Sequence, residues 1–509
     1  MKLGELLQVL DEKELCGDEQ QEITSIVSHS GSAGANSLFV AVPGLRADGH
    51  DFLERVYQAG TRAFVTQKPF SRPDAATIRV PDSRRALSLL AAQFYGHPSR
   101  QARLIGITGT NGKTTTTYLI ESILRQAGFM VGVLGTVEYR CGSLKRPAVQ
   151  TTLEPMELQK IMRDMVDGGA QYMVMEVSSQ GLDQRRVDGC QFDAGVFTNL
   201  TPEHLDYHET LENYFQSKER FFTRVLAGSQ KQTVRAVINR DDPRGRTLLG
   251  TIAVPLLSFG LSAGDIHAAS FALSPEGIRA DIHTPGSMLP IESPLLGMFN
   301  LSNILAAAAT AVALDIAPDA IRAGIEAVHT IPGRMERIEN ARGMLIVVDY
   351  AHTGDALENA LKTLQDIAQQ NIITVFGCGG DRDREKRPVM GSIAARCSDM
   401  VIITSDNPRS EEPEKIIQEI EAGVLAAGMK KASAGLFYGA EQKKVYAVCP
   451  DRAQAIARAV SLAQPGDIIL IAGKGHETFQ QIGDKKFPFD DRDVARRCLE
   501  QCLNAVPGS

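Results

Sequence analysis

The sequence predicts an α/β fold divided into three domains. Its 509 residues are enough for about three domains of roughly 150 residues each. Short apolar runs typical of strands alternate with helical segments along the whole chain, and this alternation predicts largely parallel sheets with helices on both faces. Segments rich in Gly and Pro interrupt the alternation near residues 96–102 and 331–338, and we expect the domain boundaries there.

The resulting domains are 1–98, 99–331 and 332–509. The first is the smallest, with strands predicted at 37–42, 62–67 and 76–81. GHPSRQA at 96–102 has the composition of a linker.

The second and third blocks contain apolar runs that end in glycine or polar residues. In the second block, strands are predicted at 104–108, 172–178, 194–199 and 235–242, and an Ala-rich helix at 300–316. In the third block, strands are predicted at 344–352, 371–381, 399–408 and 467–477, which favours a Rossmann-like domain. Ligands of open α/β sheets bind beyond the carboxyl ends of strands, so we expect functional residues where these runs end.

Composition excludes several classes of protein. The net charge is −7, which argues against nucleic-acid binding. No apolar run approaches the roughly 20 residues of a membrane span, and the N-terminus does not have the pattern of a signal peptide. The eight cysteines form no CxxC pair, so neither a zinc site nor a disulfide framework is predicted. We expect a cytoplasmic protein without a membrane span.

A glycine-rich segment between a predicted strand and a helix indicates phosphate binding. Residues 106–115 read GITGTNGKTT, a variant of the P-loop because Ile107 stands where the general pattern has glycine. Backbone N–H groups and the helix N-terminus can cradle phosphates there. Lys113 would reach the β- and γ-phosphates, and the Thr114 hydroxyl would ligate Mg²⁺. The expected ATP-binding residues of this central P-loop domain are Gly109, Thr110, Asn111, Gly112, Lys113, Thr114 and Thr115.

TGTNGKTT resembles the loop of the Mur ligases and of their folylpolyglutamate synthetase relatives. Further motifs match that family in the same order over nearly the whole chain. The resemblance implies an ATP-dependent carbon–nitrogen ligase, in which ATP phosphorylates a carboxylate and an amine displaces the phosphate. It also implies Mg²⁺, with two sites expected.

The resemblance assigns residues to catalysis and to metal binding. Glu176 closes a predicted strand, and FTNLTPEHLDYHETLENYFQSKERFF (197–222) supplies His204 and Lys218. In Mur ligases the lysine at this point is carbamylated, which makes Lys218 a candidate N6-carboxylysine able to hold a second Mg²⁺. The implied catalytic residues are Lys113, Glu176, His204 and Lys218, and the implied metal ligands are Thr114, Glu176, His204 and carbamylated Lys218. Four further positions match family residues around ATP: Asn303, Arg334, Asp349 and His352.

The third domain carries motifs that resemble the MurE branch of the family, which extends UDP-MurNAc-L-Ala-D-Glu. The tetrad DNPR at 406–409 resembles the version that selects meso-diaminopimelate. Arg409 can bind the far carboxylate of that substrate bidentately, Arg382 is a second clamp, and Asp406 and Glu477 can accept from its ammonium group. The implied diaminopimelate-binding residues are Arg382, Asp406, Asn407, Arg409, Gly473 and Glu477.

The segments expected to bind the UDP-linked muramoyl peptide match the family pattern less completely. Ser30, Thr151, Thr152, Ser178 and Arg186 match positions that contact the UDP-linked muramoyl peptide, and LFVAVPGLRADGHDF (38–52) resembles the uridine-binding region. Four segments depart from the family pattern. Ser28-His29-Ser30 replaces Asp-Ser-Arg, Gln150 replaces Asn, Gln180 replaces His, and Gly354 replaces Pro.

The resemblance therefore predicts a ligase of peptidoglycan biosynthesis that adds meso-diaminopimelate to the D-Glu of UDP-MurNAc-L-Ala-D-Glu and forms ADP and phosphate. A monomer is expected, with these small molecules as its partners. The departures leave open a paralogue that uses another carboxylate donor. A folylpolyglutamate-synthetase-type ligase is the other alternative, although such an enzyme should lack DNPR. A catalytically silent nucleotide-binding module should lose Lys113, Glu176 or Lys218, and all three are present.

Overall fold

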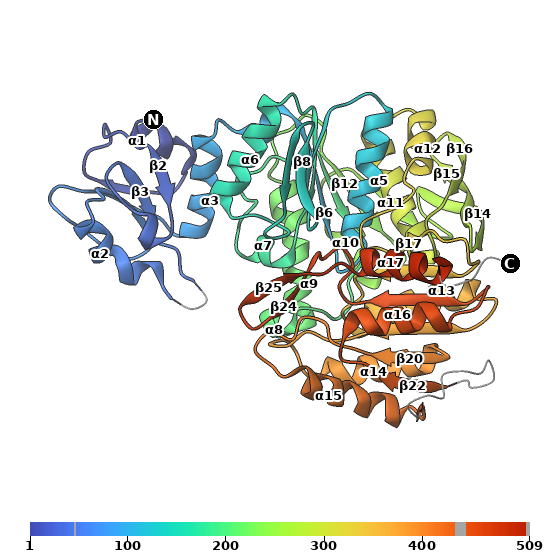
Figure 1. Ribbon diagram of the computed structural model, residues 1–509. Helices are drawn as coiled ribbons and strands as arrows, with labels where there is room; N and C mark the ends of the chain where they lie inside the picture. Colours follow the sequence, from blue (N-terminus) through green and yellow to red (C-terminus); the bar gives the residue numbers. More distant parts are fainter. Residues whose placement is uncertain (45–46, 433–443, 505–509) are drawn as a thin grey trace.

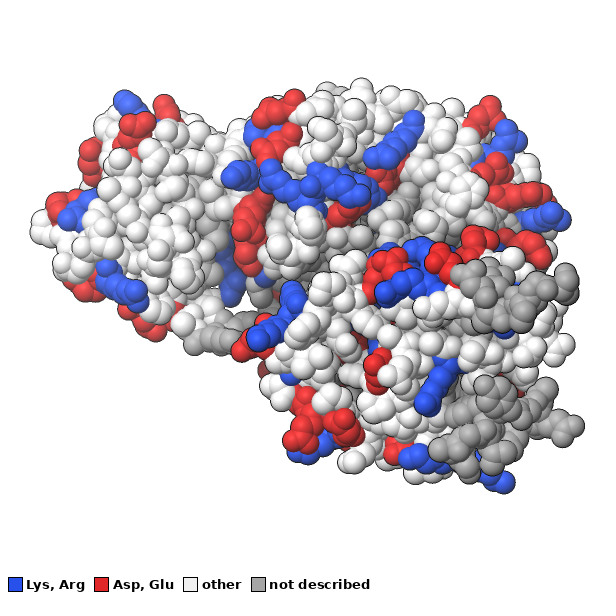
Figure 2. Space-filling view, in the orientation of Figure 1, with Lys and Arg blue, Asp and Glu red and all other residues white. Residues whose placement is uncertain are grey.

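The computed structural model describes residues 1–44, 47–432 and 444–504. Each of its three domains is built on its own α/β sheet, and the domains follow one another along the chain (Figure 1). The N-terminal domain lies to one side of the central domain, and the C-terminal domain lies beneath the central one in the same view. Within the described ranges, no helix is long and apolar enough to cross a membrane. Lys and Arg are interspersed with Asp and Glu over the visible face (Figure 2).

The N-terminal sheet has five strands in the order β1-β5-β4-β3-β2. Neighbours from β2 to β5 are parallel, and β1 is antiparallel to β5. The strands are β1 (Glu14–Cys16), β2 (Ser25–Val27), β3 (Ser37–Val40), β4 (Ala63–Thr66) and β5 (Ala76–Arg79). Helices α2 (Leu53–Gln58) and α3 (Ser83–Phe94) cover it. Leu38, Val65 and Leu90 are fully buried in the core of this domain.

The central sheet has eleven strands in the order β16-β15-β14-β13-β12-β11-β6-β10-β7-β8-β9. Its parallel core is β6 (Arg103–Thr108), β7 (Val131–Leu134), β10 (Tyr172–Glu176), β11 (Ala194–Phe197), β12 (Arg235–Asn239) and β13 (Leu256–Gly260). At one edge, β8 (Glu138–Cys141) and β9 (Leu144–Pro147) add antiparallel strands. At the other edge, β14 (Ile266–Ser274) runs parallel to β13 and forms an antiparallel ribbon with β15 (Gly277–Thr284) and β16 (Ser287–Ser293).

Helices cover both faces of the central sheet. One face carries α5 (Lys113–Gln126), α11 (Met298–Ala313) and α12 (Pro318–Glu326), and their apolar residues share one core with the sheet. The other face carries α6 (Pro155–Asp167), α7 (Ser179–Asp183), α9 (Leu211–Arg220) and α10 (Pro243–Thr251). Four consecutive threonines in α5, at 114–117, are buried. Packing against the sheet therefore outweighs the weak helix propensity of β-branched residues.

The C-terminal sheet has seven strands in the order β17-β18-β23-β19-β20-β22-β21, all parallel except β17. They are β17 (Glu336–Ile338), β18 (Leu345–Asp349), β19 (Ile372–Phe376), β20 (Met400–Ile403), β21 (Lys430–Lys431), β22 (Val445–Val448) and β23 (Ile468–Ala472). The helices are α13 (Gly354–Ile367), α14 (Lys386–Cys397), α15 (Pro413–Ala426), α16 (Arg452–Leu462) and α17 (Asp491–Asn504), and a hairpin joins β24 (Phe479–Ile482) to β25 (Lys485–Pro488).

The structure departs from the expected pattern in three ways. The segment expected as a linker contains a one-turn helix, α4 (Pro98–Gln101), with Pro98 and Ser99 buried, so it is a packed connection. The antiparallel ribbon β14–β16 was not predicted, because its strands alternate buried and exposed residues without a long apolar run. The predicted strands also extend past the observed ends: the run at 467–477 gives a strand only over Ile468–Ala472. Its remaining residues form a loop that contains Gly473 and Glu477.

Candidate active site

The phosphate loop lies at the carboxyl ends of three neighbouring parallel strands. It joins β6 to α5, with β10 and β11 on either side of β6. Gly109 and Gly112 have φ of +148° and +86°. A Cβ would lie 1.9 Å from Thr198 Oγ1 at Gly109 and 2.3 Å from Asn303 Oδ1 at Gly112, so both positions require glycine.

Two lysines, the buried Lys218 and the partly buried Lys113, meet over this loop. Lys113 Nζ donates to the carbonyls of Gly109 (2.9 Å) and Thr110 (2.8 Å), and Lys218 Nζ donates to the same Gly109 carbonyl (2.9 Å). Burial lowers the pKa of Lys113, and burial followed by the charge of Lys113 holds the pKa of Lys218 well below its ordinary value. Lys218 lies in the last turn of α9. An anion bound beside these two amino groups would stabilise their charged forms.

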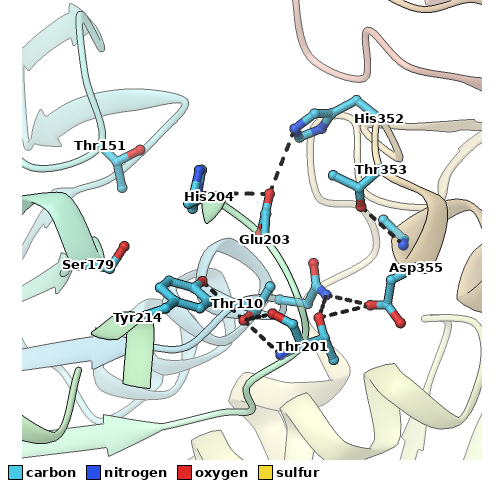
Figure 3. A network of polar contacts seen from close by, with 12 residues as sticks. Thr110, Thr151, Ser179, Thr201, Glu203, His204, Tyr214, His352, Thr353 and Asp355 are labelled. Carbon is cyan, nitrogen blue, oxygen red and sulfur yellow. Dashed lines mark hydrogen bonds and ion pairs between the residues drawn. The ribbon is translucent and has the colours of Figure 1, made fainter. Parts of the chain in front are cut away.

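Two carboxylates face the lysines. Glu176, at the end of β10, accepts from the hydroxyls of Thr114 (3.1 Å) and Thr136 (3.0 Å). Glu203 was missed by the sequence analysis, yet its Oε1 lies 3.9 Å from Nε2 of both His204 and His352 (Figure 3). Burial raises the pKa of Glu203, but the charges of His204 and Lys113 outweigh burial and hold that pKa below its ordinary value.

Tyr214 was also missed. Its hydroxyl lies 3.1 Å from Thr110 Oγ1, and Lys218 Nζ lies 4.6 Å from the centre of its ring. Glu203 stands directly before His204 in TPEHLDYH, and Tyr214 lies one helical turn before Lys218. These spacings are the signals that could have revealed both residues.

The C-terminal domain closes over the loop through two contacts. Asn111 Nδ2 and Thr201 Oγ1 donate to Asp355 Oδ2 at 3.2 and 3.0 Å, so the first turn of α13 touches the phosphate loop (Figure 3). Glu203 and His352 form the second contact. Gly354, where the family has Pro, begins α13, and Asp355 beside it keeps this contact.

Arg334, Asp349 and Asn303, which were also predicted to bind ATP, differ in the hydrogen bonds that they make within the protein. The guanidinium of Arg334 lies 4.9 Å from the ring centre of Tyr350, and its Nε has no partner among the described residues. Asp349 accepts from the backbone N–H groups of Met335 (2.7 Å) and Ala351 (2.8 Å), while burial raises its pKa. Asn303 Nδ2 donates to Asn300 (3.1 Å).

A cavity of about 420 Å³ lies between the central and C-terminal domains. It brings together most of the predicted ATP and catalytic residues: Thr110, Asn111, Gly112, Lys113, Thr114, Thr115, Glu176, His204, Lys218, Asn303, Arg334, Asp349 and His352. Thr151 and Ser178 of the predicted donor set line the same cavity. Ser30, Thr152, Arg186 and the diaminopimelate set do not line it.

Three of the residues predicted to bind the donor, Thr152, Ser178 and Arg186, are linked by hydrogen bonds. Arg186 donates to the Thr152 carbonyl (2.7 Å) and to Oε1 of Gln150 (3.0 Å), the residue that replaces the family's Asn. Thr152 Oγ1 bridges the Glu176 carbonyl and the Ser178 N–H. Ser178 caps α7 through Gly181.

In the N-terminal domain, Ser30 follows the end of β2 in a short 3₁₀ turn. Asp48 accepts from the N–H of His50 (3.0 Å) and from Lys68 Nζ (2.7 Å). Residues 45–46 of the expected uridine-binding region lie outside the described residues.

The predicted acceptor residues gather at the carboxyl ends of β19, β20 and β23. Asn407 Nδ2 donates to Glu477 Oε2 (2.8 Å), and Asp406 Oδ2 lies 2.5 Å from where a Cβ of Gly473 would be. Arg409 has φ of +52°, and its Nη1 donates to the Gly380 carbonyl (2.6 Å). Arg382 is exposed and donates to the Asp381 carbonyl (3.0 Å).

The oxygen atoms that face the phosphate cavity suit a hard cation whose remaining ligands come from phosphate. Among the described residues, no group of three or more His, Cys, Asp or Glu could hold a metal by itself. Thr114 and Glu176 nevertheless place a hydroxyl and a carboxylate together at the loop. Mg²⁺ takes few protein ligands and completes its coordination shell with phosphate and water. Thr114 and Glu176 therefore fit a Mg²⁺ site.

An α/β domain with a phosphate loop, two lysines over that loop and a closing third domain defines an ATP-dependent ligase. The chain matches family models described as "Mur ligase family, catalytic domain" over 22–95, "Mur ligase middle domain" over 107–311 and "Mur ligase, glutamate ligase domain" over 333–475. The chain belongs to the Mur ligase family.

Two relatives are each named UDP-N-acetylmuramoyl-L-alanyl-D-glutamate--2,6-diaminopimelate ligase. The protein from Geobacter metallireducens is 49% identical over 100% of both chains, and the one from Geobacter sulfurreducens is 48% identical over 97% of this chain and 98% of its own. A solved structure of a ligase with this name has a TM-score of 0.70 at 29% identity, and the match covers 99% of this chain and 100% of that one.

A Mycobacterium tuberculosis folylpolyglutamate synthase complexed with ADP has a TM-score of 0.60 at 19% identity, covering 84% of this chain and 95% of its own. At that identity the likeness concerns the fold.

Proposed function

We propose that this chain adds meso-diaminopimelate to the D-Glu γ-carboxylate of UDP-MurNAc-L-Ala-D-Glu in peptidoglycan synthesis, with conversion of ATP to ADP and phosphate. The full-length similarity to ligases of that name supports the assignment. The observation that carries the chemistry is the pair of lysines on the Gly109 carbonyl beside Glu176.

Phosphate transfer to the donor carboxylate comes first. The loop N–H groups and Lys113 hold the β- and γ-phosphates of ATP, which replace carbonyls as the partners of Lys113. Thr114, Glu176, His204 and carbamylated Lys218 would hold Mg²⁺, at up to two sites. The metal supplies positive charge between the γ-phosphate and the carboxylate that attacks it.

Lys218 is suited to carbamylation because its amine is buried and its pKa is depressed. The neutral amine nitrogen bonds to the carbon of CO₂ and loses one proton to solvent, which leaves a carbamate anion in place of the amino group beside Lys113. Incubation with ¹³C-bicarbonate should give a carbamate NMR signal that Lys218→Arg lacks. A signal of equal intensity in that variant contradicts the modification.

Amide formation follows when the amine of diaminopimelate displaces phosphate from the acyl-phosphate. Asp406 and Glu477 accept from the ammonium at the far end of the diamino acid, and Arg409 and Arg382 bind the carboxylate there. The Asp355 and Glu203 contacts bring the C-terminal domain over the cavity, where exclusion of water protects the acyl-phosphate from hydrolysis.

We propose that the muramoyl peptide is bound by Ser30, Thr151, Thr152, Ser178 and Arg186. We expect a cytoplasmic monomer that draws on soluble ATP and nucleotide-linked substrates.

An ADP-release assay tests the function. UDP-MurNAc-L-Ala-D-Glu is supplied with meso-, LL- or DD-diaminopimelate, lysine or ornithine. ADP release should depend on both substrates and be fastest with the meso isomer. No turnover with this donor, together with ATP binding, would indicate a paralogue with another carboxylate donor. Turnover with a folate donor and glutamate would indicate the folylpolyglutamate activity.

A further inference from the structure

A fully buried lysine lies among the residues proposed to bind diaminopimelate. Lys474, in the loop after β23, has a side chain that is 0% exposed. Its Nζ donates to Glu477 Oε2 (3.0 Å) and Asn407 Oδ1 (3.2 Å) and lies 3.9 Å from Asp406 Oδ1. A buried charge is costly unless it is paired and hydrogen-bonded, and this ammonium group meets three of the residues proposed to face the ligand.

The contacts of Lys474 fix which atoms of its neighbours face the ligand. Glu477 Oε2 accepts from both Lys474 and Asn407, whereas Oε1 accepts from no described residue. Asn407 Oδ1 accepts from Lys474 and from the Gln481 N–H (2.9 Å), which settles the orientation of its amide. One carboxylate oxygen of Glu477 is therefore engaged inside the protein, and the other is available to a bound ammonium group.

The loop that holds Lys474 rests on a rigid base. Arg452 and Asp491 are both 0% exposed and form an ion pair of 2.7 Å. Arg452 Nη2 also donates to the carbonyl of Ala472 (2.9 Å), the last residue of β23. Gly473 then turns the chain with φ of +113°, so the backbone of Lys474 starts from a fixed point.

The charges around Lys474 suggest what it does. Asp406 and Glu477 carry two negative charges, and Lys474 offsets one of them from inside. These three groups together leave one negative charge for an ammonium group, while Arg409 and Arg382 offer positive charge for a carboxylate. This matches the zwitterionic end of a diamino dicarboxylic acid. A monocarboxylic diamine such as lysine has no carboxylate there for Arg409 to bind.

We infer that Lys474 is a positioning residue that sets acceptor selectivity by holding Glu477 and Asn407 and by offsetting the charge of one of the two carboxylates, Asp406 and Glu477. The inference rests on the proposed diaminopimelate ligase activity. Without the internal ammonium, two full carboxylates would attract any amine and repel the carboxylate of diaminopimelate. Use of diaminopimelate should therefore suffer more than use of lysine.

Lys474→Met tests this in the full-length enzyme, because methionine keeps the length of the side chain without its charge. We expect the KM for diaminopimelate to rise about tenfold. The ratio of kcat/KM for diaminopimelate to that for lysine should fall at least about fivefold, with the KM for ATP within about twofold of wild type. Lys474→Gln, which can still donate one hydrogen bond, should be intermediate. Lys485→Met in β25 is the matched control, because Lys485 is exposed.

An unchanged selectivity ratio, with both acceptors slowed equally, would overturn the inference and leave Lys474 a structural lysine. Loss of the folded state in both Lys474 variants, but not in Lys485→Met, would overturn it as well. Failure of the proposed function is distinguishable, because the wild-type enzyme would then release no ADP with diaminopimelate.

Discussion

The phosphate cavity and the proposed acceptor site handle charge in opposite ways. In the cavity, Lys113 and Lys218 donate only to backbone carbonyls. In the proposed acceptor site, Lys474 is paired with Glu477 inside the protein. A site for a polyanion such as ATP can leave a cation such as Lys113 without a carboxylate that accepts from it directly, because the ligand brings the opposite charge. A site for a zwitterion must balance its own charge.

The largest effect is expected at the phosphate loop. Lys113→Ala removes the cation nearest the proposed γ-phosphate and should lower ATP-dependent turnover by about a thousandfold. ADP release with all substrates present measures this. Near-normal turnover would refute the assignment of the phosphate loop. Lys231→Ala is a control on the same domain, since Lys231 lies outside the cavity.

The second largest effect is expected at Arg409 and should concern only the binding of diaminopimelate. Arg409→Ala should raise the KM for diaminopimelate at least about tenfold and leave ATP binding nearly unchanged. Arg409 already has a left-handed backbone, so Arg409→Gly provides a second variant without conformational strain. An equal weakening of ATP binding and of diaminopimelate binding in both variants would mean that the phosphate cavity and the proposed acceptor site do not act separately.

A smaller effect is expected where the two regions meet. Asp355→Ala removes the acceptor shared by Asn111 and Thr201. The KM for ATP should rise about threefold to tenfold, because closure of the C-terminal domain becomes less favourable. Nucleotide titration and steady-state kinetics check this. An unaltered KM would show that the contact does not contribute to closure.

The smallest effect concerns stability near the acceptor loops. Hydrogen bonds from buried Arg387 lower the pKa of Glu411 from 4.5 to about 2. A carboxylate with a depressed pKa stabilises the fold above its unfolded pKa, and that contribution is lost as the pH falls from 4.5 towards 2. Glu411→Gln should therefore unfold at lower urea than wild type at pH 7, and the gap should narrow at pH 4 and further at pH 3. A gap independent of pH would assign the effect to packing.

Much of the fold was accessible from the sequence because each buried parallel strand is a continuous apolar run. The runs at 104–108 and 172–178 correspond to β6 and β10, with ends shifted by at most two residues. The ribbon β14–β16 escaped prediction because an edge ribbon with one exposed face has no such run. Lys218 was identified by family resemblance, since a lysine on a helix with a charged face reads as exposed, whereas this one is buried.

The sequence by itself determined the glycine-rich loop, the alternation of buried parallel strands with helices, and the motifs at strand ends. These are local features, specified by residue type and spacing. Only the tertiary structure decided which strand ends meet, because that depends on the order β11-β6-β10 in one sheet and β23-β19-β20 in another. It placed Glu203 between two histidines from different domains and buried Lys474 between Glu477 and Asn407. Such charges acquire their roles from burial and partners that are distant in the chain, and residue spacing does not encode them.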